Sequence, residues 1–384
     1  MIIPFPTVAV AEPQWTQSAE RYGTPLFYYS LPALRGQIAR IRRALADYPV
    51  RLLFATMAND RPEIQRAIAG EGVGACVNSL RHLERAVANG FAADNMHFTS
   101  CGLPVVDMAF LQSLGIPANL DSPSQVHAWC SLKKGAVVGA RINAASLAGS
   151  PAPPDRIGMD IAGFERAREI ARDLGGRVNG VHVYAGTNFQ SSSEILPILR
   201  GIFELVRSYP DLDYLNIGGG IGVDYSHAKD GFDYDAFGGA VCSLAQQVSR
   251  ERGRPLTVLF EPGRSLVASS AIFITRVTDV KTLRETRFVV VDASISLFPR
   301  PYHHPGNWHR VHVLGAPEPY TEDTIPSVVV GRTTFSRDIL GHYDLPKSLD
   351  VGSLLAFDDA GAYCESMTSR FLGQQEPACF IEKD

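Results

Sequence analysis

Short apolar runs alternate with amphipathic segments along most of the first 260 residues. The apolar runs are bounded by turn residues, as buried strands are, and the segments between them repeat their apolar positions with a helical period. Strands alternating with helices in this way predict a (β/α)8 TIM barrel closed by parallel pairing. The expected strands are 51–56, 74–77, 96–99, 118–121, 136–143, 180–184, 214–217 and 256–261.

The pattern changes after Arg264, where short β-branched runs are separated by turns. This pattern is typical of an antiparallel β-domain. We therefore expect a barrel domain over residues 28–264 and a β-domain made of residues 1–27 and 265–384. Residues 302–326 are rich in Pro and Gly and are expected to form a long loop.

Composition narrows the class of protein. With 384 residues and 45% hydrophobic content, the chain can bury a large core, and its net charge of −4 includes no run of like charge. Nucleic acid and anionic membranes are therefore not expected partners. The apolar N-terminus lacks a basic start and contains Pro4 and Pro6, no apolar run approaches the roughly 20 residues of a membrane helix, and no CxxC spacing occurs. A cytoplasmic protein is expected.

Two strand ends carry residues suited to binding an anion or a cation. Gly218, Gly219 and Gly220 directly follow an expected strand, and consecutive glycines let backbone N–H groups approach a phosphate. A tight turn is the alternative explanation. Glu261 ends the last barrel strand, with Arg264 in the next turn. Such a carboxylate can hold a protonated ring nitrogen, or it can simply pair with the arginine.

Other candidates are individually weak. Tyr184 and Thr187 follow the sixth strand, where a tyrosine can stack on a flat cofactor or belong to the core. Tyr363 follows a glycine-containing turn. Four histidines lie in the expected long loop, but they lack the spacing and partner carboxylates of a metal site, so no metal is expected. They are His303, His304, His309 and His312.

Together and in this order, the motifs resemble the fold-type III pyridoxal-phosphate (PLP) decarboxylases, which include ornithine and diaminopimelate decarboxylases and relatives in siderophore and antibiotic pathways. The resemblance runs from about Gly23 to Leu372. It implies PLP as cofactor, an amino acid or amine-bearing metabolite as substrate, and a homodimer. The residues it places near the PLP phosphate are Gly218, Gly219, Gly220, Arg264 and Tyr363, with Thr187 close by.

The resemblance also assigns roles around the cofactor ring and the substrate. Glu261 corresponds to the residue that pairs with the pyridine nitrogen, and Tyr184 to the residue that stacks on the ring. Asp292 and Arg300 lie in a segment whose arginine usually holds a substrate carboxylate. The segment "VVVGRTTFSRDIL" matches a loop that the partner subunit contributes to the site.

The sequence departs from the family pattern at several of these positions. The lysine that forms a Schiff base with PLP is replaced by Met57 in "FATMAN". Cys76 stands for an acidic residue near the ring, and His82 for a glutamate. In the partner loop, Thr334 and Phe335 replace the usual cysteine and acidic residue, although Asp338 remains. Methionine has no nucleophilic nitrogen, so any PLP is expected to bind non-covalently.

Three explanations for Met57 stay open. A single engineered Lys→Met change explains Met57 alone, whereas a natural divergent branch also explains the other substitutions. A non-catalytic homologue predicts the same loss of lysine. We therefore expect a divergent carboxy-lyase of specialised biosynthesis, with a non-catalytic ligand-binding homologue or PLP-independent chemistry in the same barrel mouth as alternatives.

Overall fold

The structure is a computed structural model that describes residues 12–229, 231–317 and 319–383, and the chain divides into two compact units. Gln37–Gly222 and Phe232–Gly263 form the barrel unit, and the remaining described residues form the β-domain unit. The expected domain limits, 28–264 for the barrel and 1–27 with 265–384 for the β-domain, stay predictions. Residues 1–11 of the expected β-domain lie outside the described residues.

Eight parallel strands close the barrel in sequence order, as expected. Several of them are buried along their whole length because core side chains cover one face and helices the other. Each strand lies within a few residues of the segment predicted for it. The strands are β2 (Val50–Ala55), β3 (Gly74–Val77), β4 (Met96–Thr99), β5 (Ala118–Leu120), β6 (Val137–Asn143), β7 (Arg177–Tyr184), β8 (Tyr214–Asn216) and β9 (Thr257–Phe260).

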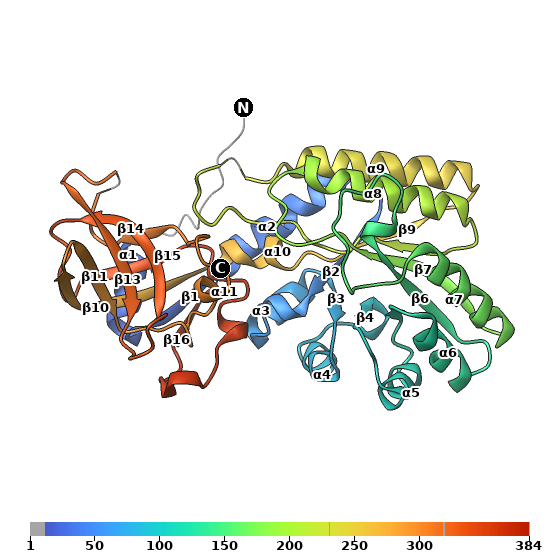
Figure 1. The fold of residues 1–384 in the computed structure, drawn as a ribbon, viewed down its shortest axis with the longest axis horizontal. Helices are drawn as coiled ribbons and strands as arrows, with labels where there is room; N and C mark the ends of the chain where they lie inside the picture. Colours follow the sequence, from blue (N-terminus) through green and yellow to red (C-terminus); the bar gives the residue numbers. More distant parts are fainter. Residues whose placement is uncertain (1–11, 230, 318, 384) are drawn as a thin grey trace. The chain divides into compact units, whose positions relative to one another are not determined.

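Helices surround the barrel strands (Figure 1). Their starts are encoded locally: the Ser79 and Ser122 side chains accept N-cap hydrogen bonds, and Ser191 forms a capping box with Glu194. Because these caps satisfy free N–H groups, they fix where each helix leaves the loop that follows a strand. The helices are α3 (Pro62–Gly70), α4 (Leu80–Ala88), α5 (Val105–Ser113), α6 (Pro123–Leu132), α7 (Ile161–Asp173), α8 (Ser192–Ser208) and α9 (Tyr234–Glu251), while α2 (Leu31–Ala44) begins before this unit.

The β-domain unit is a mostly antiparallel sheet in the order β12-β15-β10-β11-β13-β14, with β1 paired to β10 and β16. Two pairings, β11 with β13 and β1 with β16, are parallel, which the alternation pattern did not predict. Trp15 packs with Tyr28 and Ile274 in one core cluster. The strands are β1 (Leu26–Ser30), β10 (Ala271–Leu283), β11 (Thr286–Val291), β12 (Val311–Val313), β13 (Thr324–Gly331), β14 (Ile339–Pro346), β15 (Leu354–Phe357) and β16 (Ala378–Glu382), and the helices are α1 (Glu12–Tyr22), α10 (Arg264–Val267) and α11 (Arg300–His303).

The expected loop over residues 302–326 is interrupted by regular structure, so that prediction was wrong in part. α11 ends within it, and β12 pairs with β15. Among the residues that the structure describes, no group of three or more His, Cys, Asp or Glu side chains is arranged to hold a metal ion. In the same described ranges, no helix is both long and apolar enough to cross a membrane.

Two glycines make room for one aromatic ring inside the barrel. A Cβ atom at Gly180 would lie 2.2 Å from the Tyr214 ring, and one at Gly139 would lie 2.0 Å from the Tyr214 hydroxyl. Tyr214 is 7% exposed. Glycine at these strand positions is therefore required by the neighbouring side chain, although it weakens a strand intrinsically.

We predict that Gly180→Ala lowers the free energy of unfolding by about 1–3 kcal/mol, because overpacking displaces the Tyr214 ring. Urea denaturation measures the change. Gly239→Ala in α9 is the matched control, since its Cβ would meet nothing within 4 Å and alanine favours a helix by up to about 1 kcal/mol. Equal stabilities for the two variants would contradict this prediction.

Candidate active site

A buried carboxylate lies at the centre of the residues that converge on the carboxyl ends of the barrel strands. Glu261 directly follows β9 and is 7% exposed. Asn216 Nδ2 donates a hydrogen bond to Glu261 Oε1 (2.6 Å), and His182 Nε2 lies 3.2 Å from Oε2. Two strands, β8 and β7, therefore place polar side chains within hydrogen-bond distance of one carboxylate.

The electrostatics of this group favour an ionised carboxylate. Burial alone would raise the pKa of Glu261, but His182, Asn216 and Cys76 lower that pKa from 4.5 to about 2. Burial lowers the pKa of His182, so its imidazole is neutral at pH 7. Burial raises the pKa of the Cys76 thiol, and the neighbouring Glu261 raises it further, so the thiol keeps its proton. One negative charge is thus held by neutral donors.

The glycine segment after β8 has two features of an anion-binding loop. Gly218 and Gly220 adopt positive φ values of 64° and 93°. Gly218 N–H donates to Asn216 Oδ1, whereas the N–H groups of Gly219 and Gly220 have no partner within the described ranges. Packing also requires these glycines, since a Cβ at Gly219 would lie 2.3 Å from Glu261 O. The N–H groups of Gly219 and Gly220 are therefore available to donate to an anion.

Met57, Cys76 and His82 lie close in the fold, at the ends of β2 and β3. The hydroxyl of Thr56 donates to Cys76 O (3.1 Å), which joins the two strand ends. Met57 follows in a short 3-10 helix and is 42% exposed. His82 lies in the first turn of α4, where Ser79 caps its N–H and its Nδ1 lies 2.6 Å from Asn78 Oδ1.

Tyr184 and Thr187 end β7 and the turn after it. The Arg141 guanidinium lies 5.7 Å from the centre of the Tyr184 ring, and Thr187 is exposed. Arg141 comes from β6 and has a buried Nε with no hydrogen-bond partner among the described residues. An aromatic face, a cation and the ionised Glu261 are therefore available in the barrel unit.

In the β-domain unit, two arginines enclose a tyrosine. Arg264 Nη1 donates to the Tyr225 hydroxyl (2.7 Å), and its guanidinium lies 4.8 Å from the Tyr363 ring centre. The Arg300 guanidinium lies 3.2 Å from the Tyr225 ring centre. Arg300 is 1% exposed and donates to Asn307 O. Arg264, Arg300 and Tyr363 therefore belong to one cluster around Tyr225.

The remaining candidates of the β-domain unit make contacts that hold turns and strands. Asp292 accepts from Thr24 Oγ1 and Arg276 N, and buried Asp338 accepts from Ile295 N (2.8 Å). Thr334 is exposed. Phe335 packs its ring near Tyr302, Phe371 and Arg337. Their functional assignments stay predictions.

Sequence reasoning missed several members of these clusters. His182 lies two residues before Tyr184 on the same strand, and Asn216 lies two residues before Gly218, so the period of two could have placed them on the same face. Arg141 also lies within a strand. No local signal identified Tyr225.

The largely buried Glu261 and the two free glycine N–H groups are suited to a cofactor with a protonated ring nitrogen and a phosphate. The family model described as pyridoxal-dependent decarboxylase, pyridoxal binding domain, matches residues 31–268. This chain belongs to that family. The resemblance drawn from the motifs is therefore confirmed, as are the barrel with its second, mostly antiparallel domain, PLP as the cofactor, and the assignment to the carboxy-lyases.

Similar proteins include two diaminopimelate decarboxylases. The chain is 26% identical over 376 residues to that of Methanothermobacter thermautotrophicus, covering 94% of this chain and 87% of the relative. It is 27% identical over 373 residues to that of Escherichia coli K12, covering 91% and 86%. The crystal structure of diaminopimelate decarboxylase from M. jannaschii in co-complex with L-lysine has a TM-score of 0.87 at 22% identity, covering 95% of this chain and 88% of that one, which shows a shared fold.

The lowered pKa of Glu261 gives this pyridoxal-dependent decarboxylase a specific acid response. A carboxylate whose pKa is lower in the folded state stabilises the fold above pH 4.5, and that stabilisation is lost as the pH falls through about 2. We predict that Glu261→Gln lowers the free energy of unfolding at pH 7 by about 1–3 kcal/mol, because buried donors lose their ionised acceptor.

Urea denaturation from pH 7 to pH 2 measures this difference between wild type and Glu261→Gln, which should shrink in acid. Glu169→Gln is the control, since Glu169 is exposed and its ion-pair partner among the described residues is Arg166. A difference between wild type and Glu261→Gln that stays constant over this pH range would contradict the prediction.

Proposed function

We propose that this chain is a PLP-dependent carboxy-lyase that acts on an amino acid and holds its cofactor without a covalent bond. The observation that carries the proposal is the buried, ionised Glu261 with its partners Asn216 and His182. This arrangement suits a protonated ring nitrogen, while Met57 occupies the position of the family lysine.

The residues of the barrel unit fit the cofactor at three points. Glu261 would hold the ring nitrogen, the free N–H groups of Gly219 and Gly220 would hold phosphate oxygens, and Tyr184 would face the ring. When bound, PLP supplies an electron sink for the electron pair released as the substrate carboxylate leaves as CO2.

Non-covalent binding follows from where the lysines lie. Lys133 and Lys134 precede β6, and Lys281, Lys347 and Lys383 belong to the β-domain. Lys229 follows β8 in a polar turn, where its backbone N–H donates to Asp224. No lysine follows a barrel strand in the position of Met57, so the proposed site depends on hydrogen bonds, charge and stacking.

The other barrel residues have separate roles in this proposal. Burial and the neighbouring Glu261 raise the pKa of the Cys76 thiol, so it keeps its proton and is not assigned the role of a nucleophile. Burial lowers the pKa of His82. A neutral imidazole at the carboxyl end of β3 can accept a proton or return one to the substrate carbon.

The similarity to diaminopimelate decarboxylases supports a substrate with a second charged group besides the α-amino acid part. We propose a diamino acid as the first class to test. A setting in specialised biosynthesis and a homodimer, with the loop containing Phe335 directed to the neighbouring subunit, are further proposals supported by the resemblance alone.

The second candidate function is a PLP-binding homologue without catalysis, which the absence of an amine at Met57 favours. Transfer of a substrate amine onto a cofactor is faster when a lysine amine is displaced in the same site. The two candidate functions differ in CO2 release and not in cofactor binding.

We predict that the purified protein, supplied with PLP, releases CO2 from at least one of meso-diaminopimelate, lysine, ornithine and arginine. Each carries a carboxyl label, and trapped label measures the rate. Glu261→Gln should reduce the rate at least about tenfold, equivalent to about 1.4 kcal/mol of barrier, and Glu169→Gln should not. A PLP absorbance band that resists gel filtration, without CO2 release, would favour the non-catalytic homologue.

A second prediction concerns Met57. After borohydride reduction in the presence of PLP, the intact mass of the wild type should show no cofactor adduct, whereas Met57→Lys should carry one, because its amine can attack the cofactor aldehyde. Met57→Leu is the control for loss of the thioether alone. An adduct on a wild-type lysine would overturn the non-covalent mode, and an unmodified Met57→Lys that still binds PLP would mean that residue 57 does not face the cofactor.

A further inference from the structure

A pocket of about 280 Å³ lies in the barrel unit at the amino-terminal ends of the strands. Its lining residues come from the ends of α5 and α6 and from the first parts of β5, β6, β7 and β8. Active sites of (β/α)8 barrels lie at the opposite, carboxyl ends of the strands, where Glu261 and the glycine segment are found. The proposed cofactor therefore does not account for this pocket.

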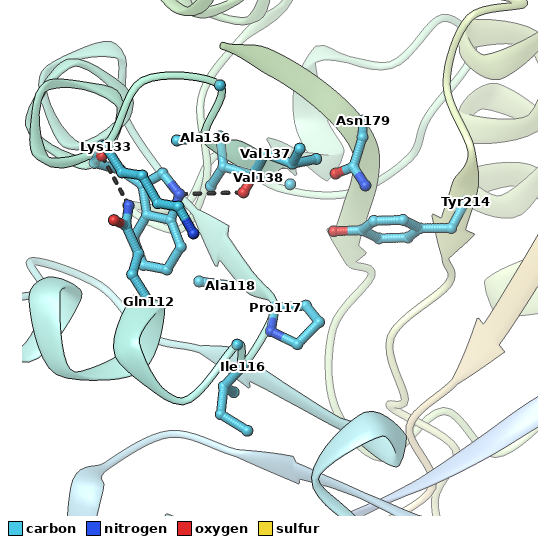
Figure 2. A pocket seen from close by; sticks show the side chains of 14 residues that line it. Gln112, Ile116, Pro117, Ala118, Lys133, Ala136, Val137, Val138, Asn179 and Tyr214 are labelled. Carbon is cyan, nitrogen blue, oxygen red and sulfur yellow. Dashed lines mark hydrogen bonds between the residues drawn. The ribbon is translucent and has the colours of Figure 1, made fainter.

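Two hydrogen bonds fix the wall that the helices form (Figure 2). Gln112 Nε2 donates to Trp129 O (2.8 Å), which joins α5 to α6, and Trp129 Nε1 donates to Val137 O (3.1 Å), which joins α6 to β6. On the inner side the wall is backbone at Gly139, where a Cβ atom would lie 2.0 Å from the Tyr214 hydroxyl. The walls are therefore formed before anything binds, and a ligand does not have to order them.

Three polar side chains border the pocket with groups that no other described residue uses. The side-chain amide of Asn179, the ammonium group of Lys133 and Gln112 Oε1 have no hydrogen-bond or ion-pair partner within the described ranges. Figure 2 shows Asn179 beside Tyr214 on one side of the pocket and Gln112 and Lys133 on the other. A bound molecule can therefore meet polar groups from two sides.

The charge around the pocket favours an anion. Lys133 lines it, and no acidic side chain among the described residues does. Asp213, whose backbone N–H donates to Asn179 O (2.6 Å), has its carboxylate paired with Arg177 (2.5 Å) and Arg254 (3.1 Å). The carboxyl end of α6 carries a partial negative charge, but the α5 amide described above already donates to one of its last carbonyls. The ammonium group is therefore the main charge that a ligand would meet.

The rest of the lining is apolar and partly aromatic. Trp129 and Tyr214 contribute rings, and Ile116, Pro117 and Val138 contribute aliphatic surface. Small-molecule sites, typically about 300–1,000 Å³, combine apolar walls of this kind with a few placed polar groups. At about 280 Å³ this pocket has the size for a small metabolite and not for a nucleotide.

We propose that this pocket is a second small-molecule site, which binds an organic anion with a flat, apolar body, such as an aromatic carboxylate. Lys133 pairs with the carboxylate, Asn179 donates a hydrogen bond to the ligand, and the apolar body lies against Trp129 and Tyr214. The site shares no lining residue with the candidate active site, so it does not depend on the proposed function.

The test compares three ligands that share a phenyl ring and differ in charge: phenylacetate, phenylacetamide and phenethylamine. Isothermal titration calorimetry of the full chain should give phenylacetate a dissociation constant below about 1 mM. Its affinity should exceed that of the neutral amide by at least about tenfold, the effect of one charge-assisted contact. Phenethylamine should bind most weakly, because its charge repels Lys133.

Two variants locate the site. Lys133→Met keeps the aliphatic stem and removes the charge, so it should weaken phenylacetate binding about tenfold and leave phenylacetamide binding unchanged. Lys134→Met is the matched control, since Lys134 is the next residue, is exposed and does not line the pocket. Asn179→Leu keeps the volume and removes the amide, so it should weaken both ligands about three- to tenfold. Thermal unfolding without ligand checks that each variant is folded.

Phenylacetate affinity that is equal in Lys133→Met and Lys134→Met would overturn the site, as would a dissociation constant above about 1 mM in the wild type. Tighter binding of phenethylamine than of phenylacetate would overturn the class of ligand. Titrations with saturating PLP separate the two sites. Displacement of phenylacetate by PLP would place it in the barrel mouth and overturn this inference, whereas a protein that binds phenylacetate and no PLP would overturn the proposed function alone.

Discussion

The structure of the barrel mouth depends on one ionised carboxylate that is removed from water. A buried charge without partners costs far more than a domain can supply, so Glu261 persists only because neutral donors surround it. His182 and Asn216 come from β7 and β8, while Glu261 follows β9. The register of these strands is therefore tied to the hydrogen bonds of a single side chain.

This constraint is independent of Met57, which we propose to stand in the position of the family lysine. Met57 is exposed and is not a member of the Glu261 hydrogen-bond network. Replacing an amine by a thioether at that position removes a covalent attachment point without leaving a buried donor unpaired. The Glu261 hydrogen-bond network and position 57, where a covalent bond to a cofactor could form, are physically separate. One can therefore change while the other is kept.

Much of the fold was predictable because the strands are short apolar runs bounded by turns, and because buried parallel strands need no polar alternation. The glycines after β8 and Glu261 after β9 were found because they stand out at strand ends. His182, Asn216 and Arg141 were missed because they lie inside strands that otherwise read as core. The parallel pairings of β11 with β13 and of β1 with β16 could not be predicted. The alternation of apolar and polar residues within a strand does not determine its partner or its direction. Asp292 and Asp338 each accept a hydrogen bond from a backbone N–H group, a contact that no motif in the sequence indicates.

The fit between Tyr214, Gly139 and Gly180 has a consequence for how this sequence can vary over evolutionary time. A side chain cannot appear at either glycine while the tyrosine ring fills the space beside it. Conversely, replacing the ring by a small residue would leave a void that only new side chains at 139 and 180 could fill. The three positions lie on adjacent strands, β6, β7 and β8, yet Gly139 and Gly180 are 41 residues apart in the chain and Gly180 and Tyr214 are 34 apart. Substitutions at these three positions are therefore coupled. A homologue with a side chain at position 180 should have a residue smaller than tyrosine at position 214.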